Sequence, residues 1–273
     1  MLNTYFCSPD EFLKNSRIPI RVKESEQEMY EEIAQIMIDT IVKKEGQRKV
    51  FICPVGPIGQ YPLFVEKVNN MRISLKNVWF INMDEYLDDD NNMISSENPL
   101  SFRSTMERLV YSKIDPELLM PKEQRCFPIP GEEKKIDRLL DEIGPVDCCL
   151  TGVGINGHIA FNEPPAEDDP ITDEQYMELG TRCLDLSKET IVNNGARKIY
   201  GALDIFPKRC ITLGMKQILK TKKIKIYLYC DWQWGIMRKI ALEPPSRFAP
   251  ASFLQLHPDS EMVITRKLLE TRI

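Results

Sequence analysis

Residues 49–59 read Lys-Val-Phe-Ile-Cys-Pro-Val-Gly-Pro-Ile-Gly, an apolar run that ends in a loop rich in glycine and proline. A short run without polar alternation predicts a strand that is buried on both faces of a sheet. The glycines and prolines of residues 54–59 predict a tight loop where that strand ends. A helix is expected from 60 to 69, so the stretch predicts the strand, loop and helix of a parallel α/β unit.

Other apolar runs repeat this pattern along the chain, at residues 78–81, 146–150, 211–213, 224–229 and 262–264. Helical patterns separate most of them, notably at 102–112 and 132–143. A further helix is expected after Ser25, which has the spacing of a capping box with Glu28. This order predicts an α/β protein with a mainly parallel sheet and helices on both faces. We expect residues 1–273 to form a single domain.

The overall composition narrows the classes of function. Hydrophobic residues make up 42% of the chain, which is enough for a sizeable core, and the net charge is −5. An acidic protein is repelled by nucleic acid and by anionic membranes, so we expect neither as a partner. The first residues lack a basic start followed by an apolar segment, and no apolar run is long enough to cross a bilayer. The sequence therefore predicts a cytoplasmic protein.

Eight cysteines are present, and five of them lie in apolar runs where cysteine acts as a small hydrophobic residue. No Cys-x-x-Cys pair occurs, and no cluster of histidine, cysteine and carboxylate residues has the spacing of metal ligands. We therefore expect reduced thiols and no metal site.

Three strand ends carry unusual polar or glycine-rich segments: residues 54–59, 81–86 and 151–164. Ligands of open parallel sheets bind beyond the carboxyl ends of the strands, so these segments are candidates for one site. In the third segment, glycines allow close approach to a ligand, and a carboxylate at Glu163 could orient the imidazole of His158 for proton transfer. Asp84 follows a buried strand and could act as a base beside a carbonyl or imine.

Plainer interpretations of these residues stay open. An Asp-Glu pair after a strand, as in Asp84 and Glu85, is more often a solvated turn or a helix cap. The glycines of residues 152–157 resemble a dinucleotide fingerprint weakly, but the third glycine comes one residue early, so no nucleotide cofactor is expected. His257 is more often a structural histidine than a ligand.

Four ordered segments, 82–86, 152–164, 211–214 and 251–257, resemble the glucosamine-6-phosphate deaminase/isomerase family. The resemblance implies a Rossmann-like parallel sheet. It also implies conversion of an amino-sugar 6-phosphate to the ketose 6-phosphate and ammonia, without a redox cofactor or catalytic metal. By this resemblance Asp84 moves the proton at C2, His158 assists ring opening and Glu163 supports the histidine. Asn156 stands where glucosamine-type members usually carry aspartate, and the galactosamine-6-phosphate branch is closer there. The substrate-binding residues that it implies are Gly56, Glu85, Gly154, Gly157, Arg182 and Gln233.

The segment that holds phosphate in the family departs from the family pattern. Val55 and Ile58 replace two threonines, Pro57 lacks an N–H donor, and Gln233 lies near the position of a phosphate lysine. Because a phosphate needs charge-assisted donors, we expect a weakened preference for a terminal phosphate. The remaining candidate cations are Arg182, Arg197, Lys198, Lys208 and Arg209. Trp232 and Trp234 could pack on a sugar, or could belong to the core or to an oligomer interface.

Two other functions stay open alongside the deaminase. One is a related sugar or lactone isomerase or hydrolase with altered phosphate recognition, and the other is a non-catalytic sugar-binding sensor. The sequence decides neither the sugar epimer nor the choice between a monomer and a homo-oligomer.

Overall fold

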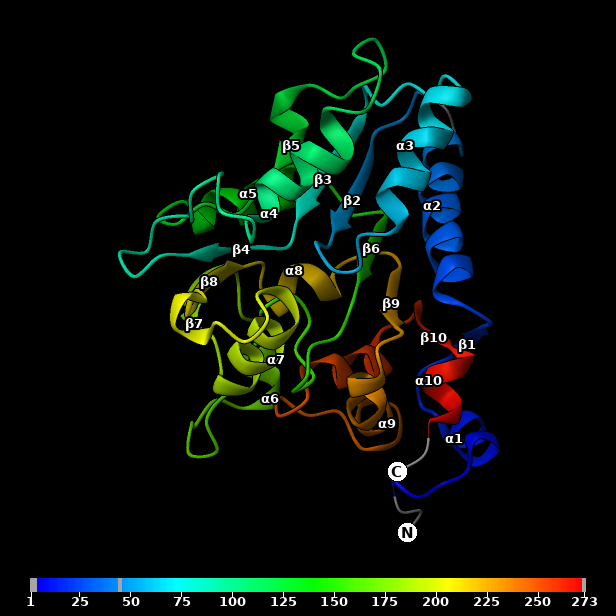
Figure 1. The fold of residues 1–273 in the computed structure, drawn as a ribbon, viewed down its shortest axis with the longest axis vertical. Coiled ribbons are helices and arrows are strands. Elements are labelled where there is room, and N and C mark those ends of the chain that lie inside the picture. Colours follow the sequence, from blue (N-terminus) through cyan, green and yellow to red (C-terminus); the bar gives the residue numbers. More distant parts are fainter. Residues whose placement is uncertain (1–3, 44–45, 272–273) are drawn as a thin grey trace.

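The computed structural model describes residues 4–43 and 46–271, which form one seven-stranded parallel sheet and one three-stranded antiparallel sheet (Figure 1). The large sheet has the strand order β1-β10-β9-β6-β2-β3-β5, and every neighbouring pair is parallel. Its strands are β1 (Ile20–Lys23), β2 (Lys49–Cys53), β3 (Val78–Asn82), β5 (Arg125–Cys126), β6 (Cys148–Thr151), β9 (Ile224–Leu228) and β10 (Ser260–Thr265). The predicted α/β class with a mainly parallel sheet is confirmed.

Helices cover both faces of the large sheet, because its strands are apolar on both sides. Phe51 and Cys53 of β2 join the core beneath α2 and α3, whereas Val50 and Ile52 join the core on the opposite face. The first core holds α2 (Glu26–Val42) and α3 (Gln60–Asn70), and the second holds α1 (Pro9–Asn15), α5 (Glu133–Ile143), α8 (Met215–Leu219), α9 (Trp234–Leu242) and α10 (Arg266–Glu270).

The helix predicted after Ser25 is α2, but its amino end lacks a complete capping box. The Ser25 hydroxyl accepts a hydrogen bond from the Glu28 N–H at 3.2 Å. The Glu28 carboxylate, however, accepts from the N–H of Glu24 instead of that of Ser25. The Ser25 side chain therefore caps the helix, and the Glu28 carboxylate binds the backbone one residue before that cap.

The apolar run at 211–213 was predicted for the parallel sheet, and here the structure differs. That run belongs to β8 (Arg209–Thr212), the central strand of the antiparallel sheet, between β4 (Asp84–Leu87) and β7 (Arg182–Asp185). Apolarity predicts burial of a strand but not its partners, and β8 is buried because the aromatic cluster around Tyr86 packs on this sheet. The remaining α-helices of the described residues are α4 (Phe102–Met106), which continues into a π-helical turn (Glu107–Tyr111), α6 (Asp173–Met177) and α7 (Lys188–Lys198).

Two features of the topology create a crevice for a ligand. The chain runs from β2 outward to β3 and β5, then returns to β6 on the other side of β2, so the strand order reverses between β2 and β6. Ligand sites of open α/β sheets lie at such a reversal. Only Met83 separates β3 from β4, so the antiparallel sheet begins directly at the carboxyl edge of the large sheet (Figure 1). Among the described residues, no helix is long and apolar enough to span a membrane.

Candidate active site

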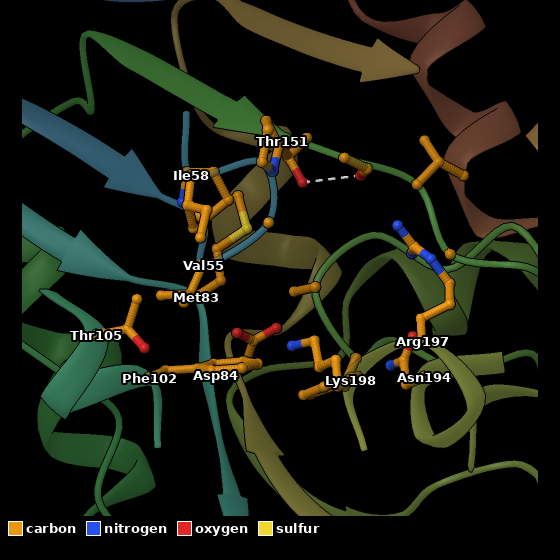
Figure 2. Close-up of a pocket in the computed structure, with 18 of the residues that line it drawn as sticks. Val55, Ile58, Met83, Asp84, Phe102, Thr105, Thr151, Asn194, Arg197 and Lys198 are labelled. Carbon is orange, nitrogen blue, oxygen red and sulfur yellow. Dashed lines mark hydrogen bonds between the residues drawn. The ribbon is translucent and has the colours of Figure 1, made fainter. Parts of the chain in front are cut away.

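A cavity of about 500 Å³ lies at the carboxyl edge of the parallel sheet, where the strand order reverses. It is lined by the loop after β2, the start of β4, α4 with the residues before it, the loop after β6, the end of α7 and the turn after β9. All three strand-end segments nominated from the sequence contribute to this lining. Figure 2 shows part of the cavity, with Asp84 and Lys198 facing each other.

The loop after β6 holds His158 tightly against the backbone. Its imidazole lies over Gly154, where an added Cβ would come within 2.0 Å of the Nε2 atom. The Gly154 N–H donates to the His158 carbonyl at 2.9 Å, which closes the turn. A side chain at position 154 would therefore push the imidazole from its place, and the glycine is required by this close approach.

His158, Asn156 and Glu163 form one hydrogen-bonded network. Asn156 Oδ1 is 2.8 Å from His158 Nδ1, and Asn156 Nδ2 donates to Glu163 Oε2 at 2.5 Å. The same Glu163 oxygen lies 3.3 Å from His158 Nδ1. A carboxylate can only accept, so the Asn156 amide must turn its NH₂ group to Glu163 and its oxygen to the histidine. In this arrangement Nδ1 of a neutral His158 carries the proton, and Nε2 keeps a lone pair that can accept one.

Glu163 is buried, yet its surroundings favour the ionised form. Burial acts to raise its pKa. The charge of His158 and the hydrogen bonds from His158, Asn156 and Thr190 outweigh burial and lower the pKa of Glu163 to about 2. The Ser187 N–H also reaches Glu163 Oε1 at 3.3 Å. Glu163 is thus a permanent negative charge behind the histidine at neutral pH.

Asp84 is the first residue of β4 and only 7% of its surface is exposed. Burial and the neighbouring charge of Glu85 raise the pKa of Asp84 to about 8, while Lys198 acts to lower it. No hydrogen bond from the described residues reaches its carboxylate group, which lines the cavity. A carboxyl group with a pKa near working pH and an open path to a ligand is suited to proton transfer.

Glu85 points to the other side of β4, where it binds the residues at the start of α4. Its carboxylate accepts from the N–H groups of Phe102 and Arg103, each at 3.0 Å, and from the Ser101 hydroxyl at 3.2 Å. Arg103 Nε adds an ion pair at 3.3 Å. Glu85 therefore stabilises the amino end of α4, the helix-cap role that the sequence left open, and it does not line the cavity.

The opposite end of the cavity contains the altered loop 54–58 and the turn after β9. The polar atoms of the Gln233 side chain are hydrogen-bonded to the backbone. Nε2 donates to Val153 O at 2.9 Å, and Oε1 accepts from the N–H groups of Tyr229 and Cys230. Trp232 lines the cavity, with the Arg197 guanidinium 4.9 Å from its ring centre. Trp234 instead is buried and packs against Tyr5. The two tryptophans thus divide between cavity and core.

Known proteins similar to this chain are named glucosamine-6-phosphate deaminases. One from Lachnoclostridium phytofermentans is 30% identical over 213 residues, which cover 76% of this chain and 82% of the relative. The chain belongs to the glucosamine-6-phosphate deaminase family. Glucosamine-6-phosphate deaminase 1 of Bacillus subtilis is 27% identical over 92% of this chain and its own full length. No family model matches the sequence.

Solved structures of known proteins share the fold of this chain. A monomeric glucosamine-6-phosphate deaminase superposes with a TM-score of 0.79 and 26% identity, covering 93% of this chain and all of the other. A 6-phosphogluconolactonase from Thermotoga maritima superposes with a TM-score of 0.63 at 13% identity, which shows a shared fold alone. The predicted resemblance to the deaminase family is therefore confirmed.

Several deaminase-family residues nominated from the sequence lie away from the cavity. Arg182 on β7 donates to Asn162 Oδ1 at 2.8 Å and is not a lining residue. Gly157 has a φ of +90° and packs against Ala249, so it shapes the loop behind the cavity. Of the other cations, Lys208 and Arg209 do not line the cavity either, and Arg209 pairs with Asp185. Gly56 and Gly154 do line it.

Further residues, with only weak signals in the sequence, line the cavity or support the histidine network. Arg197 and Lys198 stand at the end of α7, and Arg108 follows α4; all three line the cavity. Ser187 and Thr190 support the histidine network from the start of α7, with Ser187 Oγ accepting from Asn156 Nδ2 at 3.0 Å. Their only sequence signal was a Ser-x-x-Thr start of a helix, which is typical of any amino-terminal cap.

Proposed function

We propose that this protein converts an amino-sugar 6-phosphate of the glucosamine-6-phosphate type into the ketose 6-phosphate and ammonia. The observation that carries the proposal is that Asp84 and His158 line one cavity, in a chain of the glucosamine-6-phosphate deaminase family. Two proton-transfer groups on different walls suit a reaction that must open a sugar ring and then move a proton between carbons.

The roles follow from the surroundings of each group. His158 Nε2 accepts the proton of the C1 hydroxyl and returns it to the ring oxygen, and the charge of Glu163 stabilises the imidazolium formed between these steps. The hydrogen bond from His158 to Asn156 fixes the orientation and the tautomer of the imidazole. Ionised Asp84 then removes the proton at C2, which becomes bonded to C1, and water replaces ammonia at C2. Gly56, where nothing lies within 4 Å of an added Cβ, lets the substrate approach the backbone closely, and Gly154 leaves room for the His158 imidazole.

A phosphate on the substrate is supported by donors that replace the missing hydroxyls. The N–H groups of Gly56 and Ile58 have no acceptor among the described residues, and they lie just before the amino end of α3, where anions are favoured. Arg197 and Arg108 add positive charge to the same cavity. These donors favour a phosphorylated substrate, against the weakened preference expected from the loop sequence.

A binding experiment tests the phosphate directly. Glucosamine 6-phosphate should bind at least about tenfold more tightly than glucosamine, the gain of one charge-assisted hydrogen bond or more. Arg197→Met should reduce that advantage, whereas Lys208→Met, a change outside the cavity, should not. Equal affinities for the two sugars in calorimetry would restore the weakened-phosphate hypothesis.

Ammonia release tests the reaction itself. The wild-type protein should release ammonia from glucosamine 6-phosphate or galactosamine 6-phosphate, and Asp84→Asn should release it far more slowly. Hydrolysis of 6-phosphogluconolactone without ammonia release from either amino sugar would favour the lactone alternative, and binding without turnover would favour the sensor. We also propose that residues 1–273 form a single domain and that the enzyme is cytoplasmic, a location that the eight free thiols favour.

A further inference from the structure

Lys198 ends helix α7 with its side chain in the cavity beside Asp84. Its Nζ atom lies 4.7 Å from the ring centre of Phe102 and 5.6 Å from that of Tyr86. No carboxylate of the described residues lies within ion-pair distance of Nζ, which leaves the ammonium free to face the cavity. In Figure 2 this ammonium and the Asp84 carboxylate point toward each other.

The two neighbouring carboxylates of β4 show what Asp84 lacks. Glu85 has an arginine in contact and several N–H donors. Asp84 has neither, and Lys198 is the cation whose charge acts on it. A buried carboxylate without donors stays neutral unless a positive charge favours its ionised form.

We propose that Lys198 is the positioning residue for Asp84: its ammonium, held on the aromatic surface of Phe102 and Tyr86, favours the ionised form of the Asp84 carboxylate and directs it into the cavity. The location acts on this charge in both directions: desolvation lowers the pKa of Lys198 to about 8, whereas the charge of Asp84, the helix dipole at the carboxyl end of α7 and the two rings favour the ammonium. A lysine also presents a single mobile charge, which can follow a carboxylate that gains and loses a proton.

Other titratable groups around the pair set the direction of the effect. Glu85 and Tyr86 on β4, Cys210 on β8 and Arg197 on α7 interact with one or both members, and His158 and Arg108 line the same cavity. Burial and Glu85 raise the pKa of Asp84, and Lys198 opposes them. Removing Lys198 must therefore raise the pH at which Asp84 ionises.

The titration of Asp84 tests this coupling without any substrate. Protein carrying aspartate labelled with ¹³C at the carboxyl carbon would be titrated by NMR, and Asp84→Asn would assign the resonance. Lys198→Met should shift the Asp84 midpoint upward by about one pH unit or more, the effect of losing a close opposite charge. Lys198→Gln should do the same if Lys198→Met folds poorly, and Lys198→Arg should restore most of the wild-type midpoint.

Lys188→Met is the matched control, because Lys188 begins the same helix and does not line the cavity. It should leave the Asp84 midpoint unmoved. An unchanged midpoint in both Lys198→Met and Lys198→Gln, or an equal shift in Lys188→Met, would overturn the proposal. The role of Asp84 as a base rests on the proposed function, but the titration needs no activity. An inactive wild-type protein would contradict the proposed function, whereas an unchanged Asp84 midpoint in the Lys198 variants would contradict the role of Lys198.

Kinetics then distinguishes positioning from substrate binding. If the wild-type protein is active, Lys198→Met should move the acidic limb of kcat/KM to higher pH, and Lys198→Arg should reverse the shift. A variant that raised KM for the phosphorylated sugar and left both the limb and the NMR midpoint in place would show Lys198 to be a substrate anchor instead, which contradicts the proposal.

Discussion

Glu163 and Asp84 are both buried carboxylates beside one cavity, and the protein surrounds them in opposite ways. The loop after β6 and the start of α7 give Glu163 hydrogen-bond donors and a histidine, so its pKa falls to about 2. The start of β4 gives Asp84 burial and an acidic neighbour, so its pKa rises to about 8. The difference separates a fixed charge that supports a neighbour from a group that exchanges protons.

The largest expected effect comes from removing the basicity of Asp84. Asp84→Asn keeps the size of the side chain and should lower turnover by roughly 10²–10⁴-fold, the contribution of a general base. Exchange of the C2 proton with deuterated solvent should disappear with it. Asp89→Asn, on the exposed loop after β4, should have wild-type activity. Undiminished exchange in Asp84→Asn would show that Asp84 is not the base, and the contrast with Glu163 would then have no catalytic meaning.

Glu163→Gln should reduce turnover by a smaller factor, roughly 10–100-fold, because the amide keeps the network but removes the charge that stabilises the imidazolium. Steady-state kinetics would measure the loss, with Glu189→Gln on the exposed side of α7 as the control. A loss as small as that of the control would mean that Glu163 only maintains structure.

The pH profile follows from the raised pKa of Asp84. A base must be ionised to accept a proton, so kcat/KM should rise about tenfold per pH unit as pH increases toward 8 and then level off. Glu163 is already ionised over this range and should add no limb between pH 5 and 9. A profile that is flat from pH 6 to 9 in the wild-type protein contradicts the assignment of Asp84.

The smallest effect concerns stability. Asp84 ionises near pH 4 in the unfolded chain and near 8 in the fold, so ionisation favours unfolding increasingly across this window. Asp84→Asn should therefore unfold at a Tm a few degrees higher than wild type at pH 8, at least about 1 kcal/mol of stability, and the gain should vanish near pH 4. Thermal melts at both pH values would measure it, and an equal gain at both would contradict the linkage.

Sequence patterns predicted the strands of the large sheet best where the chain carries an uninterrupted apolar run. Those runs became β2, β3, β6, β9 and β10, because strands buried on both faces need them. The short strands β1, β4, β5 and β7 carry no such signal, since their side chains are polar or mixed and their pairing decides their structure.

Site residues were predictable where they followed a predicted strand. Asp84 and His158 were found in this way, and both line the cavity. Lys198 was named only as one of several candidate cations for a phosphate, and its place beside Asp84 was not predicted, because a basic residue in the last turn of a helix is common for reasons of the helix dipole. Glu85 and Arg182 could not be excluded from sequence, since only the fold decides which side of a strand meets the cavity.

The alternation along β4 makes the length of the segment between β3 and β4 a condition of function. Asp84 and Tyr86 line the cavity, whereas Glu85 holds the amino end of α4 on the other side. Inserting or deleting one residue near Met83 would exchange the two carboxylates, so the base would lose the cavity and the helix would lose its cap together. Evolution can therefore substitute residues in this segment far more readily than it can change their number.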